Sequence, residues 1–175
     1  MALLRKPETG ADRTENMAPR QSKKVGKRIK KSEVPACVKE WLRDGDFTFE
    51  IENEQITATP AALLEKMEFL RSKLKVLHSG IPVGTMKGKE ILPAHALAMS
   101  LHINSDAFSC LQLNREQAIA YLRREALPCD VNAMRGYCLL TYQDVPLGFA
   151  KYASNRLNNL YPQEWRIRNQ RLKDI

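Results

Sequence analysis

Long hydrophobic runs are missing from this chain of 175 residues. No apolar stretch approaches the roughly 20 residues that a membrane-spanning helix needs, and the N-terminus lacks the hydrophobic region of a signal peptide. We therefore expect a cytoplasmic protein without a membrane partner.

Closely spaced metal ligands are missing as well. The sequence has four scattered cysteines, Cys37, Cys110, Cys129 and Cys138, and three histidines, His78, His95 and His102. Such cysteines fit neither a zinc ribbon nor a small disulfide scaffold, so reduced thiols are expected. His95 and His102 are seven residues apart and would share a helical face, but no third ligand accompanies them. No metal site is predicted.

A phosphate-binding glycine loop is the third absence. Gly80, Gly84 and Gly88 recur every four residues, yet their segment contains neither the G-x-G-x-x-G pattern nor a Gly-Lys-Ser/Thr ending. We interpret the segment as a strand and a turn that carry Lys87 and Lys89. A doubly wound nucleotide-binding sheet is not supported, and no cofactor-binding residue is predicted.

Positive charge is abundant but unevenly placed. The formal net charge is +8, and residues 1–31 supply +7 of it, since ten lysines and arginines there oppose three acidic residues. This leader has no hydrophobic periodicity, which predicts a basic, disordered arm. A second local excess begins at Gly148, after which six basic residues oppose two acidic ones, a net of +4.

Short strands with intervening helices make up the rest of the chain. Hydrophobic periodicity predicts helices near 34–42, 60–73, 93–101 and 115–125, and strands near 47–51, 55–59, 74–77, 111–113, 136–142 and 147–152. Thr59 and Pro60 should begin the second helix, and Asn114 with Gln117 should cap the last one. Without repeated β-α-β units, the pattern indicates an α+β domain or a small mixed barrel.

The segment Pro146–Arg168, which we call the closing block, mixes cations, amides and aromatic residues. Cations hold phosphates, amides reach base or ribose edges, and aromatic rings stack on unpaired bases, so this mixture favours RNA binding. The predicted RNA-binding residues are Lys87, Lys89, Lys151, Asn155, Arg156, Asn159, Tyr161, Arg166 and Arg168. Three alternatives stay open: Trp165 as core or contact, the two asparagines as turn residues, and the aromatic residues as core.

Three stretches together resemble the C-terminal region of the bacterial Fmu/Sun-type rRNA cytosine-5 methyltransferases, particularly the RsmF branch. They are GKEILPAHALAMS at 88–100, AIAYLRREA at 118–126, and the closing block. In that family these stretches belong to a PUA-like RNA-binding domain, a compact mixed β-barrel. The resemblance therefore implies an α+β fold with a PUA-like barrel and a role in binding ribosomal RNA.

The same resemblance suggests a domain division. Residues 1–33 would be a basic linker in which residues 1–7 resemble the end of the last strand of the family's methyltransferase domain. Residues 34–87 would be a small accessory α+β domain, and residues 88–175 the PUA-like domain.

The catalytic parts of the family have no counterpart in this sequence. Family members bind S-adenosylmethionine on a Rossmann-like domain and use cysteines for catalysis. Cys129 resembles those cysteines only in following a proline. We predict no catalytic residue and no cofactor in this chain, whose activity as an enzyme stays open. The expected function is docking a methyltransferase, in cis or in trans, on ribosomal RNA. The alternatives are a non-catalytic subunit for a separate methyltransferase chain, and a protein-interaction module that uses Leu139, Tyr142 and Phe149.

Overall fold

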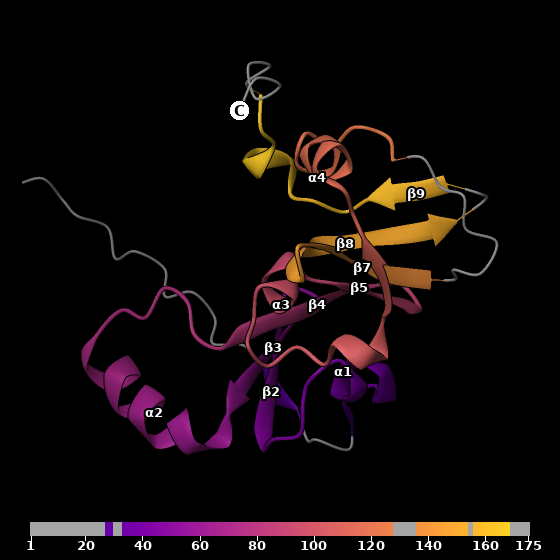
Figure 1. Cartoon of the computed structure of the whole chain (residues 1–175). Coiled ribbons are helices and arrows are strands. Elements are labelled where there is room, and N and C mark those ends of the chain that lie inside the picture. The colour runs from indigo at the N-terminus through magenta and orange to yellow at the C-terminus, as the bar shows by residue number, and fades with distance from the viewer. Residues whose placement is uncertain (1–26, 30–32, 128–135, 154–155, 169–175) are drawn as a thin grey trace, which may run out of the picture.

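Two sheets dominate the computed structural model, which describes residues 27–29, 33–127, 136–153 and 156–168. The first sheet has the strand order β1-β2-β3-β4-β5 and the second β6-β7-β8-β9 (Figure 1). Cys129, Asn155 and residues 1–26 of the predicted leader lie outside the described residues.

The first sheet is antiparallel throughout. It consists of β1 (Lys27–Ile29), β2 (Phe47–Glu52), β3 (Gln55–Pro60), β4 (Ile81–Lys87) and β5 (Glu90–Pro93). The predicted hairpin is confirmed as β2 and β3, joined by Asn53 and Glu54 at φ angles of 48° and 66°, which suit a tight two-residue turn. The predicted strand and turn at the glycines are confirmed as β4 and β5, which meet at Gly88 with φ 61°.

The strand β1 corrects one prediction, because Lys27–Ile29 belong to the leader that was expected to be disordered. β1 pairs antiparallel with β2, so that Ile29 lies opposite Phe49. Ile29 is partly buried against the core. One apolar residue at the sheet edge, together with backbone pairing, is enough to extend the sheet into a basic segment without hydrophobic periodicity.

The second sheet carries the closing block. It consists of β6 (Ser109–Gln112), β7 (Gly136–Tyr142), β8 (Val145–Ala153) and β9 (Arg156–Asn159). β6 is parallel to β7, whereas β7, β8 and β9 are successively antiparallel. The predicted strands at 136–142 and 147–152 are confirmed as β7 and part of β8. β9 was missed because Leu157 is its one apolar residue and the segment shows no alternation.

Mixed α and β structure is confirmed, but the described strands do not close the predicted barrel. The free edge of β9 pairs with Leu127 through an isolated bridge at Leu157, and it does not pair with β6. Because closure needs hydrogen bonds between the two edge strands, the described part of the chain contains two open sheets.

The helices are short. They are α1 (Ala36–Glu40), α2 (Leu64–Lys73), α3 (His95–Ala98) and α4 (Arg115–Leu122), with 3₁₀ segments η2 (Ala61–Leu63), η3 (Ser105–Ala107) and η4 (Gln163–Trp165). The predicted capping box is confirmed, since Gln117 N donates to Asn114 Oδ1 at 2.9 Å and Asn114 N to Gln117 Oε1 at 3.0 Å. In the described residues no helix is long and apolar enough to cross a membrane.

The start of α2 differs from its prediction. Thr59 and Pro60 end β3, where Thr59 is buried opposite Thr48, and η2 separates them from the helix. Proline cannot donate a hydrogen bond to a strand ladder, so a residue that can begin a helix can also end a strand. The strand expected at 74–77 is absent, because these residues have no regular structure.

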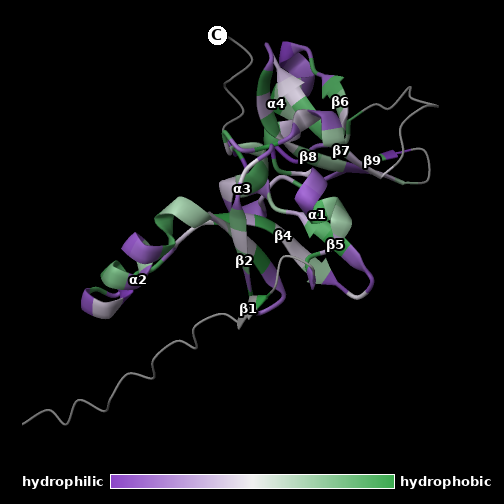
Figure 2. Cartoon of the chain, turned by 90° about the horizontal axis from the view of Figure 1, so that it is seen from below, coloured by the Kyte–Doolittle hydropathy of each residue, from purple (hydrophilic) through white to green (hydrophobic). Residues whose placement is uncertain are grey.

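The apolar residues of α2 were expected to face a core, yet the helix buries none of its residues. Figures 1 and 2 show α2 extending away from both sheets. Phe69 is 65% exposed, and Leu74, just past the helix, is 62% exposed. The helix is held by Arg71, whose guanidinium contacts Glu50 at 3.2 Å and Ser79 at 2.7 Å.

A common core crosses the domain boundary that was predicted near residues 87 and 88. This boundary falls inside the β4–β5 hairpin. The first core cluster contains Val38 and Val83 from one side of it and Leu97, Leu139 and Phe149 from the other. The two predicted domains therefore share a hairpin and a hydrophobic core.

Candidate nucleic-acid interface

An aromatic cluster anchors the segment that follows β9. The Tyr161 ring lies edge-on to His95 and Tyr121, with ring centroids 5.2 Å and 5.5 Å apart. Trp165 lies edge-on to His95 at 5.1 Å. Tyr121 is fully buried, and its hydroxyl donates to the Phe149 carbonyl at 2.9 Å. The end of the chain's described part is thus fixed against α3, α4 and β8.

A glycine makes this close packing possible. Gly148 in β8 has φ 143°, and a Cβ built there would lie 2.4 Å from the Tyr121 hydroxyl and 2.8 Å from His95 Nδ1. His95 Nδ1 is buried without a hydrogen-bond partner among the described residues. Burial also lowers the pKa of His95, so the ring is held in its neutral form.

Two predicted contact residues, Asn159 and Tyr161, are engaged within the fold. Asn159 Nδ2 donates to the Tyr121 carbonyl at 2.8 Å, and Tyr161 N donates to Asn159 Oδ1 at 2.9 Å. Arg124 donates to the carbonyl oxygens of both residues. Asn159 therefore acts as a turn residue, the alternative left open by the sequence, and the Tyr161 ring belongs to the aromatic cluster.

Three side chains in or next to this cluster are available for contact. Trp165 is 56% exposed, and Arg166 and Arg168 are exposed. Ile167 N donates to the Leu122 carbonyl at 3.1 Å, which ties this stretch to the end of α4. We call Trp165, Arg166 and Arg168 the C-terminal group. It combines an aromatic face with two cations on a segment fixed by backbone hydrogen bonds.

A second set of predicted residues, Lys87, Lys89 and Lys151, gathers around the β4–β5 turn, and we call it the turn group. Lys87 and Lys89 are exposed. Lys151 Nζ lies 2.5 Å and 2.7 Å from the two carboxylate oxygens of Glu90 and 5.4 Å from the centroid of the Tyr137 ring. The hydrogen bond from Lys151 lowers the pKa of Glu90, so this carboxyl group is ionised at neutral pH.

The register of β8 and β9 separates Arg156 from the C-terminal group. Arg156 is exposed and pairs with Ala153 at one end of this ladder, whereas Asn159 pairs with Ala150 at the other, from which the chain continues to the C-terminal group. The closing block is therefore not one continuous patch. Its cations lie at both ends of β9, an edge strand of the second sheet.

Sequence reasoning missed the two residues that position these groups. Arg124 donates hydrogen bonds to two carbonyl oxygens, and its backbone φ of 58° lies in a region that arginine rarely adopts. Glu90 pairs with a lysine that is 61 positions away. No local pattern reveals either contact, because both join segments that are distant in the sequence.

Other chemistry finds little support in the described residues. There, no group of three or more histidine, cysteine or acidic side chains is arranged to hold a metal ion. Cys37 and Cys110 are exposed free thiols, and Cys138 is buried. The Cys110 thiol is nevertheless partly buried, and this burial, together with the charge of Asp106, raises its pKa. A smaller fraction of the thiol is therefore present as the nucleophilic thiolate at neutral pH.

The second sheet matches a known protein family. Residues 108–167, from just before β6 to just past η4, match the family described as the methyltransferase RsmF PUA domain. The chain is also 35% identical over 108 residues to the ribosomal RNA small subunit methyltransferase F of Shewanella woodyi (strain ATCC 51908 / MS32). This match covers 61% of the chain but only 20% of the relative. It confirms the predicted resemblance: the chain is similar to an RsmF-type rRNA methyltransferase, and its residues 108–167 match the RsmF PUA domain.

Proposed function

We propose that this chain binds ribosomal RNA and docks a methyltransferase on it. The observation that carries the proposal is the position of Trp165, Arg166 and Arg168: exposed, adjacent, and inside or next to the segment that matches the RsmF PUA domain. Cations next to an aromatic face suit an unpaired RNA strand, whose phosphates are held while its bases stack.

The proposed contacts divide into phosphate contacts and positioning residues. The cations Lys87, Lys89, Lys151, Arg156, Arg166 and Arg168 would hold phosphates. Asn159 and Tyr161 would position the C-terminal group through their internal contacts. Asn155, the remaining predicted contact, is proposed on its place in the sequence alone.

Under this proposal, methyl transfer to cytosine takes place on a separate S-adenosylmethionine-binding domain that is joined in cis or supplied in trans. The RNA-binding part contributes by holding the substrate near that domain, which replaces a bimolecular encounter with a local one. The relative from Shewanella woodyi is named for the small ribosomal subunit. Small-subunit ribosomal RNA is accordingly the RNA that we propose.

The test measures binding of a small-subunit rRNA transcript over a range of salt concentrations. Each lost phosphate contact should reduce the salt slope by about 0.7 to 0.9. Arg166→Ala with Arg168→Ala should therefore weaken binding and lower the slope by about 1.4 to 1.8. The matched control, Lys66→Ala with Lys73→Ala on α2, removes the same charge from exposed positions. Unchanged affinity and slope in the arginine variant would refute the assignment.

A second function, contact with another protein domain, is favoured by the exposed apolar residues in and around α2. The surface that the sequence suggested for such contacts is wrong, since Leu139 and Phe149 are each only 1% exposed. α2 instead offers Phe69 at 65% exposure and Leu70 at 38%. If this helix binds a catalytic domain, Phe69→Ser should reduce co-purification with a methyltransferase and leave RNA affinity unchanged.

A further inference from the structure

A pocket of about 560 Å³ lies between the two sheets, beside the turn group. Its walls come from both halves of the chain: α1 and the β4–β5 turn on one side, β6 and the start of β7 on the other. Cavities of about 300 to 1,000 Å³ are typical of small-ligand sites. Neither the match to the PUA domain nor the proposed phosphate contacts account for this pocket.

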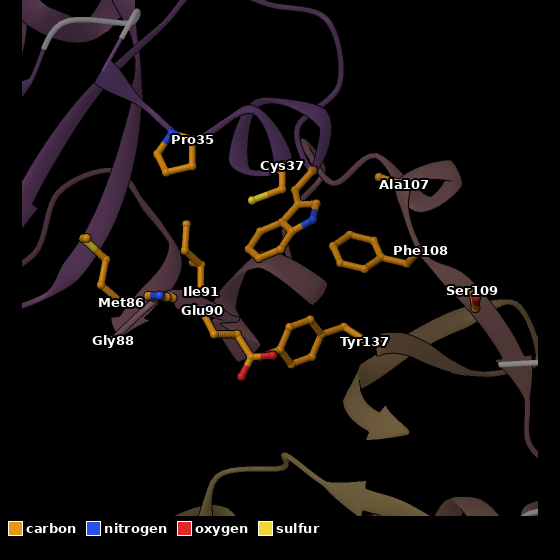
Figure 3. A pocket seen from close by; sticks show the side chains of 12 residues that line it. Pro35, Cys37, Met86, Gly88, Glu90, Ile91, Ala107, Phe108, Ser109 and Tyr137 are labelled. Atoms are coloured by element: carbon orange, nitrogen blue, oxygen red, sulfur yellow. The ribbon is translucent and has the colours of Figure 1, made fainter. Parts of the chain in front are cut away.

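Aromatic rings form one wall. The Trp41 ring is 5.5 Å from Phe108 and 6.4 Å from Tyr137, measured between centroids, and all three residues line the pocket. Figure 3 shows Phe108 and Tyr137 on the same side of the cavity, with Met86 across from them. Such a wall suits a flat ring, because every nucleobase has a π face that stacks on aromatic side chains.

Two polar groups meet at the edge of this wall. The Glu90 carboxylate lies beside the hydroxyl end of Tyr137 (Figure 3). That hydroxyl oxygen is buried without a hydrogen bond of acceptable geometry among the described residues. Burial, the neighbouring Glu90 charge and a hydrogen bond to Glu90 raise the pKa of Tyr137 to about 12, so the group remains a hydrogen-bond donor. The pocket thus presents an ionised acceptor beside a hydroxyl donor whose hydrogen bond to that acceptor is poorly aligned.

We propose that the pocket receives one unpaired base of the bound RNA and that guanine is preferred, an inference that rests on the proposed RNA-binding function. The Watson–Crick edge of guanine carries adjacent N–H donors next to a carbonyl oxygen. A carboxylate keeps lone pairs for such donors even when it is bonded to a lysine. Glu90 would accept the base N–H groups, and the Tyr137 hydroxyl would donate to the base oxygen.

The surrounding charges explain why a base, rather than a phosphate, enters. The Glu90 carboxylate disfavours a phosphate inside the pocket. Lys151, whose Nζ lies 2.5 Å from Glu90, balances this charge, so that the RNA backbone is not repelled from the rim. Lys89 lines the same pocket and is exposed. It would hold the phosphate of the inserted nucleotide at the rim while the base occupies the interior.

The test uses the fluorescence of Trp41. Trp165→Phe leaves Trp41 as the only tryptophan of the full chain, which has two. Labelled RNA pentamers of sequence UUNUU, with each of the four bases as N, are titrated into this variant and into the unsubstituted chain, which keeps Trp165 of the C-terminal group. Anisotropy of the label reports total binding, and quenching of Trp41 reports entry into the pocket. The guanine pentamer should quench Trp41 saturably, with a dissociation constant about tenfold below that of the others.

Glu90→Gln should reduce the guanine preference to less than about threefold, since one acceptor becomes a donor. Tyr137→Phe, which removes only the hydroxyl, should also reduce it. Glu116→Gln, an equivalent change at an exposed position on α4, should retain it. Binding by anisotropy without any Trp41 response overturns the pocket assignment but leaves the proposed function intact. An equal response to all four bases overturns the guanine preference, and absence of any binding by the unsubstituted chain overturns both proposals.

Discussion

Replacing Gly148 by alanine tests how the C-terminal group is positioned. The new methyl carbon would lie 2.4 Å from the Tyr121 hydroxyl and 2.8 Å from His95 Nδ1, distances that a Cβ atom essentially never shows. The backbone adds a second cost, because φ at this glycine is 143°, where side-chain-bearing residues are strained. The nearer neighbour cannot withdraw freely, since Tyr121 is fully buried and bonded to the Phe149 carbonyl.

The magnitude follows from these two costs. Strain at such a φ amounts to about 1–3 kcal/mol. Overpacking of a dense site adds about 1–3 kcal/mol. Gly148→Ala should therefore reduce the free energy of unfolding by about 2–6 kcal/mol, a large share of the roughly 5–15 kcal/mol that stabilises a typical domain.

Urea denaturation, followed by circular dichroism, measures the loss. Gly136→Ala is the matched control, because φ there is 76° but a Cβ would meet nothing within 4 Å. It isolates the backbone cost, at about 1–2 kcal/mol. Combining Gly148→Ala with Tyr121→Phe removes the nearest clashing atom, so the double variant should lose less than the sum of the single losses. A Gly148→Ala loss no greater than that of Gly136→Ala, or strict additivity with Tyr121→Phe, would refute the steric argument.

Three further predictions concern single contacts. Tyr121→Phe alone should cost about 1 kcal/mol of unfolding free energy, because the buried Phe149 carbonyl loses one of its two donors among the described residues and keeps only Leu160 N; a neutral effect in urea denaturation would contradict this. The pKa of His95 is lowered from its ordinary 6.5 by burial, so its contribution to stability is present above that pH and is lost as pH falls through the folded-state pKa. The stability profile of His95→Gln should therefore be flatter on acidification, and an unchanged profile would count against burial of a neutral ring. Lys151→Met should raise the pKa of Glu90 towards its ordinary value in an NMR titration; no shift would mean that the ion pair does not persist in solution.

The sequence predicted elements whose signals are local. The β2–β3 hairpin follows from strict alternation around a polar turn, and the α4 cap from an asparagine three residues before a glutamine. Predictions failed where the tertiary environment decides. The apolar periodicity of α2 indicates a buried face, but within the described part of the chain none of the helix's residues is buried. The strand β9 exists because β8 offers it an edge, which its own four residues do not reveal.

The candidate site shows the same division. Composition located the cations and aromatic residues of the closing block, but it did not assign their roles. Tyr161, expected to stack on a base, packs on His95 and Tyr121, whereas Trp165, left open as core or contact, is 56% exposed. Burial of this kind depends on α3 and α4, which lie far from the block in the sequence, so no reading of the block alone decides which ring faces solvent.

Some residues of the closing block position the C-terminal group and others are free to contact RNA, and this difference has a consequence for binding. The arginines of the C-terminal group follow a stretch that is held by Asn159, Tyr161 and Arg124, so their backbone is ordered before RNA arrives and little conformational entropy remains to be lost. Loosening that stretch should weaken binding without removing any contact. Among molecules that remain folded, Gly148→Ala should therefore bind the rRNA transcript more weakly than Gly136→Ala, with the same salt slope, because the number of phosphate contacts is unchanged. A reduced slope would instead mean that the aromatic cluster determines which cations reach the RNA.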